Sequence, residues 1–156
     1  MSDKTNTLTK ILQEGGPERL DRYLAEEEAN FFDSKNAFGT WLKETILSKG
    51  MSQQDLFVGA DIPERYGYKL LSGEKHTAKR DVILRLLISA SLSVREVDRG
   101  LKLYGFSPLY ARVPRDAVLI IGINEGKDVY MMNAFLKERG MRELEPCGEP
   151  LEKSKE

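Results

Sequence analysis

Apolar residues recur at intervals of three and four along most of this chain, and the residues between these runs are of the kinds that begin or end helices. Alternating patterns typical of half-buried strands are almost absent. The pattern therefore predicts an all-α protein. The chain has 156 residues, 40% of them apolar, which suffices for one compact domain or for a domain with arms. No apolar run approaches the roughly 20 residues of a membrane-spanning helix, so we expect no membrane partner.

Five capped helices are expected between residues 36 and 105. The third of them begins near Pro63, and the fifth opens with a capping box formed by Ser93 and Glu96. The residues that mark the helices, in chain order, are Asn36 and Gly50 for the first, Ser52 and Asp61 for the second, Ile62, Ser72 and Gly73 for the third, Ile83 and Ala90 for the fourth, and Ser93 and Gly105 for the fifth.

Further helices are expected on both sides of this region. Gly16 and Pro17 open a helix that runs to about Asn30 in an acidic N-terminal arm, residues 1–35. The run from residue 116 to 125 fits a buried strand or a buried helix by periodicity alone, and we favour a helix capped by Asp116 and stopped by Gly126. A partner helix then follows from a cap at residue 128. The C-terminal extension, residues 106–145, is thus a helical pair, and residues 146–156 are expected to be a disordered tail.

The net charge of −1 hides an uneven distribution. Residues 1–35 sum to −3, residues 36–116 to +4 and residues 117–156 to −2. A binding surface is governed by its own field rather than by the charge of the whole chain, so the middle region remains compatible with a polyanionic partner. Cys147 is the only cysteine and stands in a polar tail, and no secretory signal precedes it, which favours a reducing cytoplasm.

Residues 52–72, SQQDLFVGADIPERYGYKLLS, predict a short capped helix, a turn and a second helix with a polar outer face. These are the dimensions of a DNA-binding helix-turn-helix, in which the second helix lies in the major groove. Short helix pairs occur in any all-helical protein, so the spacing alone is weak. The order of the surrounding helices strengthens the interpretation, because one helix precedes the pair and two follow it.

The chain resembles the Xre-type helix-turn-helix regulators, whose DNA-binding domain is the five-helix domain of the phage lambda repressor and Cro. It is similar above all to a bacterial subgroup in which YxYxxLSG ends the recognition helix and two Arg-Asp pairs flank a GxxPLYxR segment. The residues that carry this resemblance are Tyr66, Tyr68, Leu71, Ser72, Gly73, Arg80, Asp81, Gly105, Pro108, Leu109, Tyr110, Arg112, Arg115 and Asp116. The resemblance implies a lambda-repressor-like domain over residues 36–105 and covers the chain from about residue 42 to residue 144.

Two departures from the family pattern form one hypothesis. Phe57 stands where the family has Ala in the first motif helix, and Gly67 stands where it has Val or Ile in the second. A large ring facing a missing side chain keeps the buried volume roughly constant. We therefore interpret the two residues as one compensated change. The turn residue Asp61, where the family has Gly, is a mild change because Asp tolerates the left-handed conformation.

Six side chains are the expected DNA contacts. Gln53 can donate to a phosphate beside the free amides of its helix. Arg65 and Lys69 lie four residues apart on the exposed face of the second helix, where Arg binds guanine with two hydrogen bonds. Tyr68 serves either a phosphate contact or packing, and Tyr66 is expected to face the core. A basic loop with His76 supplies the last two contacts, Lys75 and Lys79, whereas Arg80 is expected to pair with an acid.

Enzyme chemistry finds little support. The single histidine and the single cysteine cannot form a metal cluster or a nucleophile with its base, and residues 122–127 are one residue short of a phosphate-binding loop. We expect no cofactor and no metal. The prediction is a DNA-binding regulator acting on duplex DNA as a homodimer, with Met131, Met132 and Phe135 either at the dimer contact or in the core. The alternative is a protein-interaction module, an antitoxin or adaptor, whose acidic arm engages a protein partner.

Overall fold

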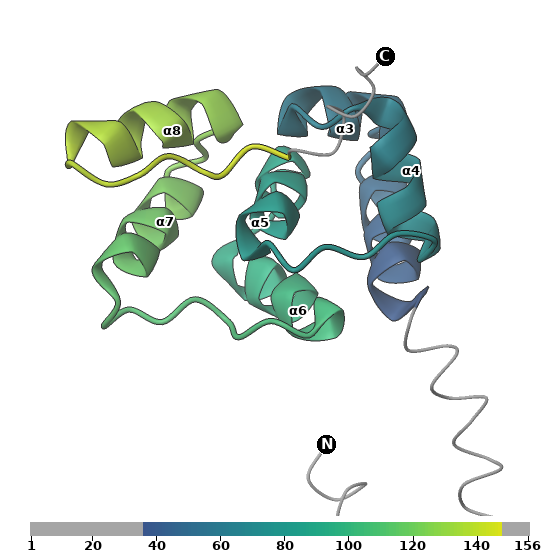
Figure 1. Cartoon of the computed structure of the whole chain (residues 1–156), viewed down its shortest axis with the longest axis horizontal. Helices are drawn as coiled ribbons and strands as arrows, with labels where there is room; N and C mark the ends of the chain where they lie inside the picture. Colours follow the sequence, from purple (N-terminus) through teal and green to yellow (C-terminus); the bar gives the residue numbers. More distant parts are fainter. Residues whose placement is uncertain (1–35, 148–156) are drawn as a thin grey trace, which may run out of the picture. The chain divides into compact units, whose positions relative to one another are not determined.

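A computed structural model describes residues 36–147. These residues form seven helices and no strand, which confirms the all-α prediction. The first helix occupies residues 36–48, and the others, labelled in Figure 1, are α3 (Gln53–Ala60), α4 (Glu64–Ser72), α5 (Arg80–Ser89), α6 (Val94–Tyr104), α7 (Pro114–Asn124) and α8 (Val129–Glu138). None of these seven helices combines the length and apolar character needed to cross a bilayer. The helix expected near residues 17–30 lies outside the described part of the chain.

Most helix ends follow the signals in the sequence. Ser52 accepts a hydrogen bond from the Asp55 amide at 3.0 Å, and the capping box of Ser93 and Glu96 is complete. Asp128 caps α8 by accepting the Met131 amide at 2.8 Å. The residues that close four helical segments have positive φ angles, namely Gly50, Asp61, Gly73 and Gly105. Local capping chemistry therefore accounts for the order and length of these helices.

Three expected boundaries are wrong. Asn36 already lies within the first helix instead of capping it, and α4 begins at Glu64, two residues after the buried Ile62. Asp116 does not cap α7, because the cap is Val113 and Pro114 occupies the first helical position. Proline has no amide hydrogen to satisfy, which makes it a favourable first residue. The Asp116 side chain instead takes hydrogen bonds from outside its own helix.

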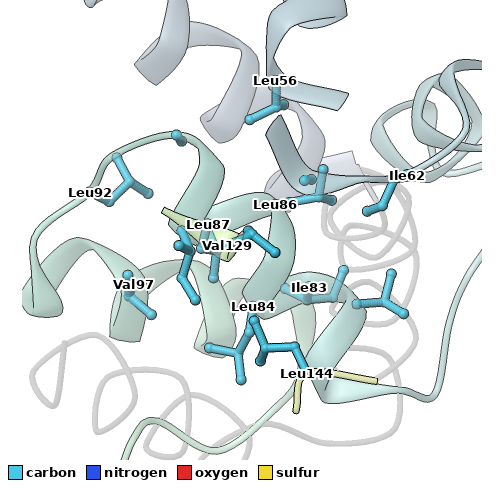
Figure 2. Packing of buried hydrophobic residues seen from close by; sticks show 14 of the residues in the cluster. Leu56, Ile62, Ile83, Leu84, Leu86, Leu87, Leu92, Val97, Val129 and Leu144 are labelled. Atoms are coloured by element: carbon cyan, nitrogen blue, oxygen red, sulfur yellow. The ribbon is translucent and has the colours of Figure 1, made fainter. Parts of the chain in front are cut away.

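The core surrounds α5. Eight consecutive residues of this helix, from Asp81 to Ile88, are buried, because α3, α6 and α8 all pack against it. Figure 2 shows Leu84 and Leu86 of α5 among side chains of α3 and of the segment that follows α8. A helix buried on every side must satisfy its polar residues with protein partners. Asp81 and Arg85 are the two buried polar residues of α5 that require them.

The two C-terminal helix pairs are copies of one another. Residues 80–110, here hairpin 1, align without a gap on residues 115–145, here hairpin 2, at a constant spacing of 35 residues. The turn residues match, since Ser91 and Gly126 both have positive φ. Even a loop hydrogen bond is repeated, from the Leu109 and Leu144 amides to Asp98 and Asn133. The identical pairs are Arg80/Arg115, Asp81/Asp116, Leu84/Leu119, Ile88/Ile123, Val94/Val129, Leu101/Leu136, Lys102/Lys137, Gly105/Gly140 and Leu109/Leu144.

The Arg-Asp pairs join the hairpins reciprocally. Arg80 forms two hydrogen bonds to Asp116 at 3.0 Å each, and Arg115 forms two to Asp81 at 3.0 and 2.9 Å. The arginine of each hairpin thus binds the aspartate of the other hairpin. The same exchange of contacts occurs across the interface of a two-fold symmetric dimer. The two hairpins therefore form an internal pseudo-dimer within one chain.

The same four side chains hold the segments that end each hairpin. Arg80 donates to the carbonyls of residues 107 and 108, while Asp116 accepts the Tyr110 amide at 3.0 Å. In the second copy, Arg115 donates to the carbonyls of residues 142 and 143, and Asp81 accepts the Glu145 amide at 2.9 Å. The chain after α8 is consequently fixed across α5, as Figure 1 shows in yellow. Cys147, expected in a polar tail, is buried.

Candidate nucleic-acid interface

The turn between α3 and α4 is closed by Asp61. Its φ of 57° and ψ of 49° are left-handed, and its amide donates to the carbonyls of Phe57 and Val58. An aspartate tolerates this conformation better than a larger residue does. The inward face of α4 then packs against the core through buried Tyr66, Gly67, Leu70 and Leu71. The burial of Tyr66 confirms its expected core-facing position.

Phe57 and Gly67 are in direct contact across the motif. A β-carbon placed on Gly67 would lie 2.4 Å from Cδ1 of the Phe57 ring, which is far inside van der Waals distance. The ring is 1% exposed. The space that a valine at position 67 would fill is therefore occupied by Phe57, which supports the hypothesis of a compensated change.

The outward face of α4 carries the expected base-contacting residues. Arg65 is exposed and Lys69, one helical turn later, is half-buried. Tyr68 is 44% exposed and packs edge-on against Phe57, with ring centroids 5.0 Å apart. Partial desolvation, a hydrogen bond with Glu64 and the charge of that carboxylate raise the pKa of Tyr68. The tyrosine thus packs at its ring and remains a neutral hydroxyl at its exposed edge.

The remaining expected contacts lie at either side of α4. Gln53 is the first residue of α3 and is half-buried. Lys75 is exposed, and its amide donates to the Lys69 carbonyl at 3.0 Å, which folds the loop back on the end of α4. His76 stacks on Tyr104 with centroids 4.6 Å apart. The backbone of Lys75 is therefore fixed at the end of α4, while its side chain is exposed to solvent.

Lys79 has an acidic neighbour. Its ammonium lies 3.7 Å from the carboxylate of Glu145, which belongs to the segment after α8, and both side chains are nearly half exposed. An exposed pair of this kind contributes about 0–1 kcal/mol and is weakened by salt. Lys79 is therefore the expected contact whose charge is most strongly offset by the protein itself.

The charge of the motif region is balanced. Between residues 52 and 79 there are as many acidic side chains as basic ones: Asp55, Asp61, Glu64 and Glu74 against Arg65, Lys69, Lys75 and Lys79. Part of the positive charge counted for residues 36–116 is also internal, because Arg80, Arg85 and Arg115 are engaged within the fold. The local field at the motif is thus weaker than the regional sum of +4 suggests.

Arg85 is a structurally important residue that the sequence reasoning missed. It is 5% exposed and donates to three carbonyls, those of Ala60 at 3.1 Å, Leu144 at 2.9 Å and Glu145 at 2.8 Å. The first of these carbonyls ends α3, and the other two belong to the segment after α8. Arg85 therefore links the motif directly to hairpin 2. The available signal was an arginine inside the apolar run of α5, at a position where a charge needs partners.

The reciprocal carboxylates are held in their charged form. Burial by itself would raise the pKa of Asp81, but hydrogen bonds from Arg115 and the Glu145 amide and the nearby guanidinium charges outweigh it, so the pKa is lowered. Asp116 shows the same balance, with Arg80 and the Tyr110 amide as its donors. The expectation that Arg80 pairs with an acid is confirmed.

The three residues expected either at a dimer contact or in the core differ in burial. Met132 is wholly buried, Phe135 is half-buried beneath Lys127 and Arg139, and Met131 is 44% exposed.

Comparison of the chain with protein-family models, with curated proteins and with solved structures finds no match in any of the three.

Proposed function

We propose that this protein is a sequence-specific DNA-binding regulator that reads duplex DNA with α3, the turn at Asp61 and α4. The observation that carries the proposal is the division of α4 into two faces. Tyr66 and Leu70 are buried against the core, while Arg65 projects into solvent and Lys69 lies one turn further along. A helix anchored in this way can present Arg65 to the edge of a guanine in the major groove.

In this proposal, the helix over residues 36–48 and α3 to α6 form the five-helix, lambda-repressor-like domain that the Xre resemblance implies. Gln53 and Lys75 contact phosphates on either side of α4 and fix its register. Tyr68 adds a hydroxyl at the same surface. Lys79 binds a phosphate by giving up its weak ion pair with Glu145. The protein works in the cytoplasm as a homodimer on two half-sites about one helical turn apart and needs no cofactor and no catalysis.

The balanced charge of residues 52–79 favours a second candidate, a protein-interaction module such as an antitoxin or adaptor. Duplex DNA binding that uses phosphate contacts must weaken steeply as salt rises. A module that binds a protein through the acidic arm would show little affinity for DNA at any moderate salt concentration. Salt dependence therefore separates the two candidates.

The decisive experiment selects bound sequences from random duplexes with the wild-type protein and with Arg65→Ala and Lys69→Ala. We expect a consensus from the wild type and a loss of about 1–3 kcal/mol in discrimination at one base pair when Arg65 is removed. Lys75→Glu should weaken binding to all sequences alike. Lys102→Ala, an exposed cation on α6, is the matched control and should change nothing. The proposal fails if no consensus emerges and neither motif variant alters binding.

A further inference from the structure

Arg85 is a buried cation that has no carboxylate partner within residues 36–147. Its side chain is 5% exposed, and its hydrogen bonds go to carbonyl oxygens, one at the end of α3 and two in the segment after α8. The negative end of the α3 dipole offsets part of its charge. The buried carboxylate of the same helix, Asp81, bonds instead to Arg115. A buried guanidinium in this setting favours a full negative charge that accepts its remaining N–H groups.

Arg85 also lines an open groove of about 780 Å³ along the segment that follows α8. Sites for small organic ligands span roughly 300–1,000 Å³, so the groove has the size of such a site. Met141 and Pro146 supply apolar surface to it. The groove therefore brings together a buried cation, a side that is open to solvent and apolar contacts.

The other charged side chains of the groove also favour an anion. Lys137 and Arg142 are exposed, and neither forms an ion pair within the described part of the chain. Glu143 and Glu145 line the groove as well, but the Glu145 carboxylate lies 3.7 Å from the ammonium of Lys79. With the buried guanidinium, three cations thus outnumber two carboxylates, one of which is already paired.

The internal repeat shows that helix packing alone does not require this set of cations. The residues 35 positions from Arg85 and Arg142 are Ile120 and Ser107, and both are uncharged. The equivalent place, formed by α7 and the segment after α6, therefore packs without either arginine. The two arginines distinguish the groove from its copy, as expected if they serve a ligand.

We propose that this groove binds a small molecule that carries a carboxylate or phosphate group, with Arg85 as its principal anchor. Oxygens of either group accept parallel hydrogen bonds from a guanidinium, while Lys137 and Arg142 hold the solvent side of the anion. Glu143 weakens this binding by repulsion between like charges. The inference goes beyond the proposed function, because no DNA contact takes part in it.

Nuclear magnetic resonance of the full chain tests the site without DNA, through the Nε–H signal of Arg85. The protein is titrated with inorganic phosphate, with benzoate and with chloride at equal ionic strength. We expect a saturable shift of this signal with phosphate, with benzoate or with both, and none with chloride. A response to phosphate alone assigns the site to phosphate-bearing ligands, and a response to benzoate alone assigns it to carboxylates.

Exposed residues supply the variants, because a change of Arg85 itself would remove hydrogen bonds that hold the fold. Lys137→Gln with Arg142→Gln should weaken binding of the probes about tenfold. Glu143→Gln should tighten it. Lys102→Gln, which alters the exposed counterpart of Lys137 on hairpin 1, is the matched control and should bind as the wild type.

Thermal unfolding confirms that these variants remain folded, so a loss of binding reports on the groove. The inference is overturned if neither anion gives a saturable shift, or if chloride gives the same shift. It is equally overturned if the double variant binds the probes as tightly as the wild type does.

Discussion

Single residues in this protein are often readable only together with the residue that they contact. Phe57 is a large ring in one motif helix and Gly67 a poor helix former in the next, and each by itself looks unfavourable. The contact between them shows one filled volume. A related exchange links the two hairpins. Gly100 of α6 lies against Leu87, whereas Gly122, the counterpart of Leu87, lies against Met132 and, at a greater distance, against Phe135, the counterpart of Gly100. Position alone therefore does not say whether a glycine is a defect.

The Phe57 and Gly67 contact gives a prediction at this scale. Gly67→Val should destabilise the protein by about 1–3 kcal/mol through overpacking, although valine is the better helix former by a few tenths of a kcal/mol. The double variant Phe57→Ala with Gly67→Val, which moves the larger side chain from α3 to α4, should lie closer to the wild type than either single variant. Urea unfolding of the four proteins measures this coupling. A higher midpoint for Gly67→Val alone would contradict the compensation hypothesis.

At the scale of helices and their connections, the sequence was informative wherever local chemistry decides. Ser52, Ser93, Asp128 and the closing glycines predict helix ends because capping involves residues within one turn. The sequence predicts Asp116 as a helix cap, but its carboxylate accepts hydrogen bonds from Arg80, which is remote in sequence. The pairing of the two Arg-Asp motifs was likewise outside local reasoning, although the constant spacing of 35 residues was visible in the sequence.

The paired aspartates predict an acid-sensitive contact between the hairpins. Their pKa values are lower in the folded protein than in the unfolded chain, so their contribution to stability is present above the unfolded pKa, about 4, and is lost as the pH falls through the folded values. We expect the free energy of unfolding to decline steeply below about pH 4. In the double variant Asp81→Asn with Asp116→Asn, the free energy of unfolding should be lower at pH 7 and should decline less steeply on acidification.

Urea unfolding at a series of pH values measures this difference. Asp55→Asn is a suitable control, because Asp55 is exposed in the first turn of α3 and should shift stability by no more than about 0.5 kcal/mol. Equal acid slopes for the wild type and the double variant would show that other groups cause the loss.

On the scale of the whole molecule, the described residues on the two sides of residue 105, where a domain boundary is expected, pack against one another. Arg85 bonds to both the end of α3 and the segment after α8, and Leu119, Met132 and Leu136 of hairpin 2 are fully buried. A sequence pattern predicts that these residues are buried, but it does not predict whether they pack within hairpin 2 or against α5. That information lies in long-range contacts, which have no local signature.

Ending the chain after Gly105 should therefore prevent the motif from folding. Removal of hairpin 2 exposes apolar surface of α5 and leaves Asp81 and Arg85 without most of their partners, and breaking such a buried pair alone costs about 3–5 kcal/mol. We expect little near-ultraviolet circular dichroism and no cooperative unfolding for residues 1–105, against a cooperative transition for the full chain. A stable truncated protein with native-like unfolding would refute this integration.

The reciprocal clamp also sets an order of events during synthesis. When α5 and α6 leave the ribosome, Arg80 and Asp81 can form their ion pairs only after Arg115 and Asp116 have been translated. The hydrogen bonds of Arg85 to the carbonyls of residues 144 and 145 form later still. Domains fold as units once their contacts are available. The candidate recognition helix, although it is translated early, can therefore reach its final stability only after residue 145 has been made.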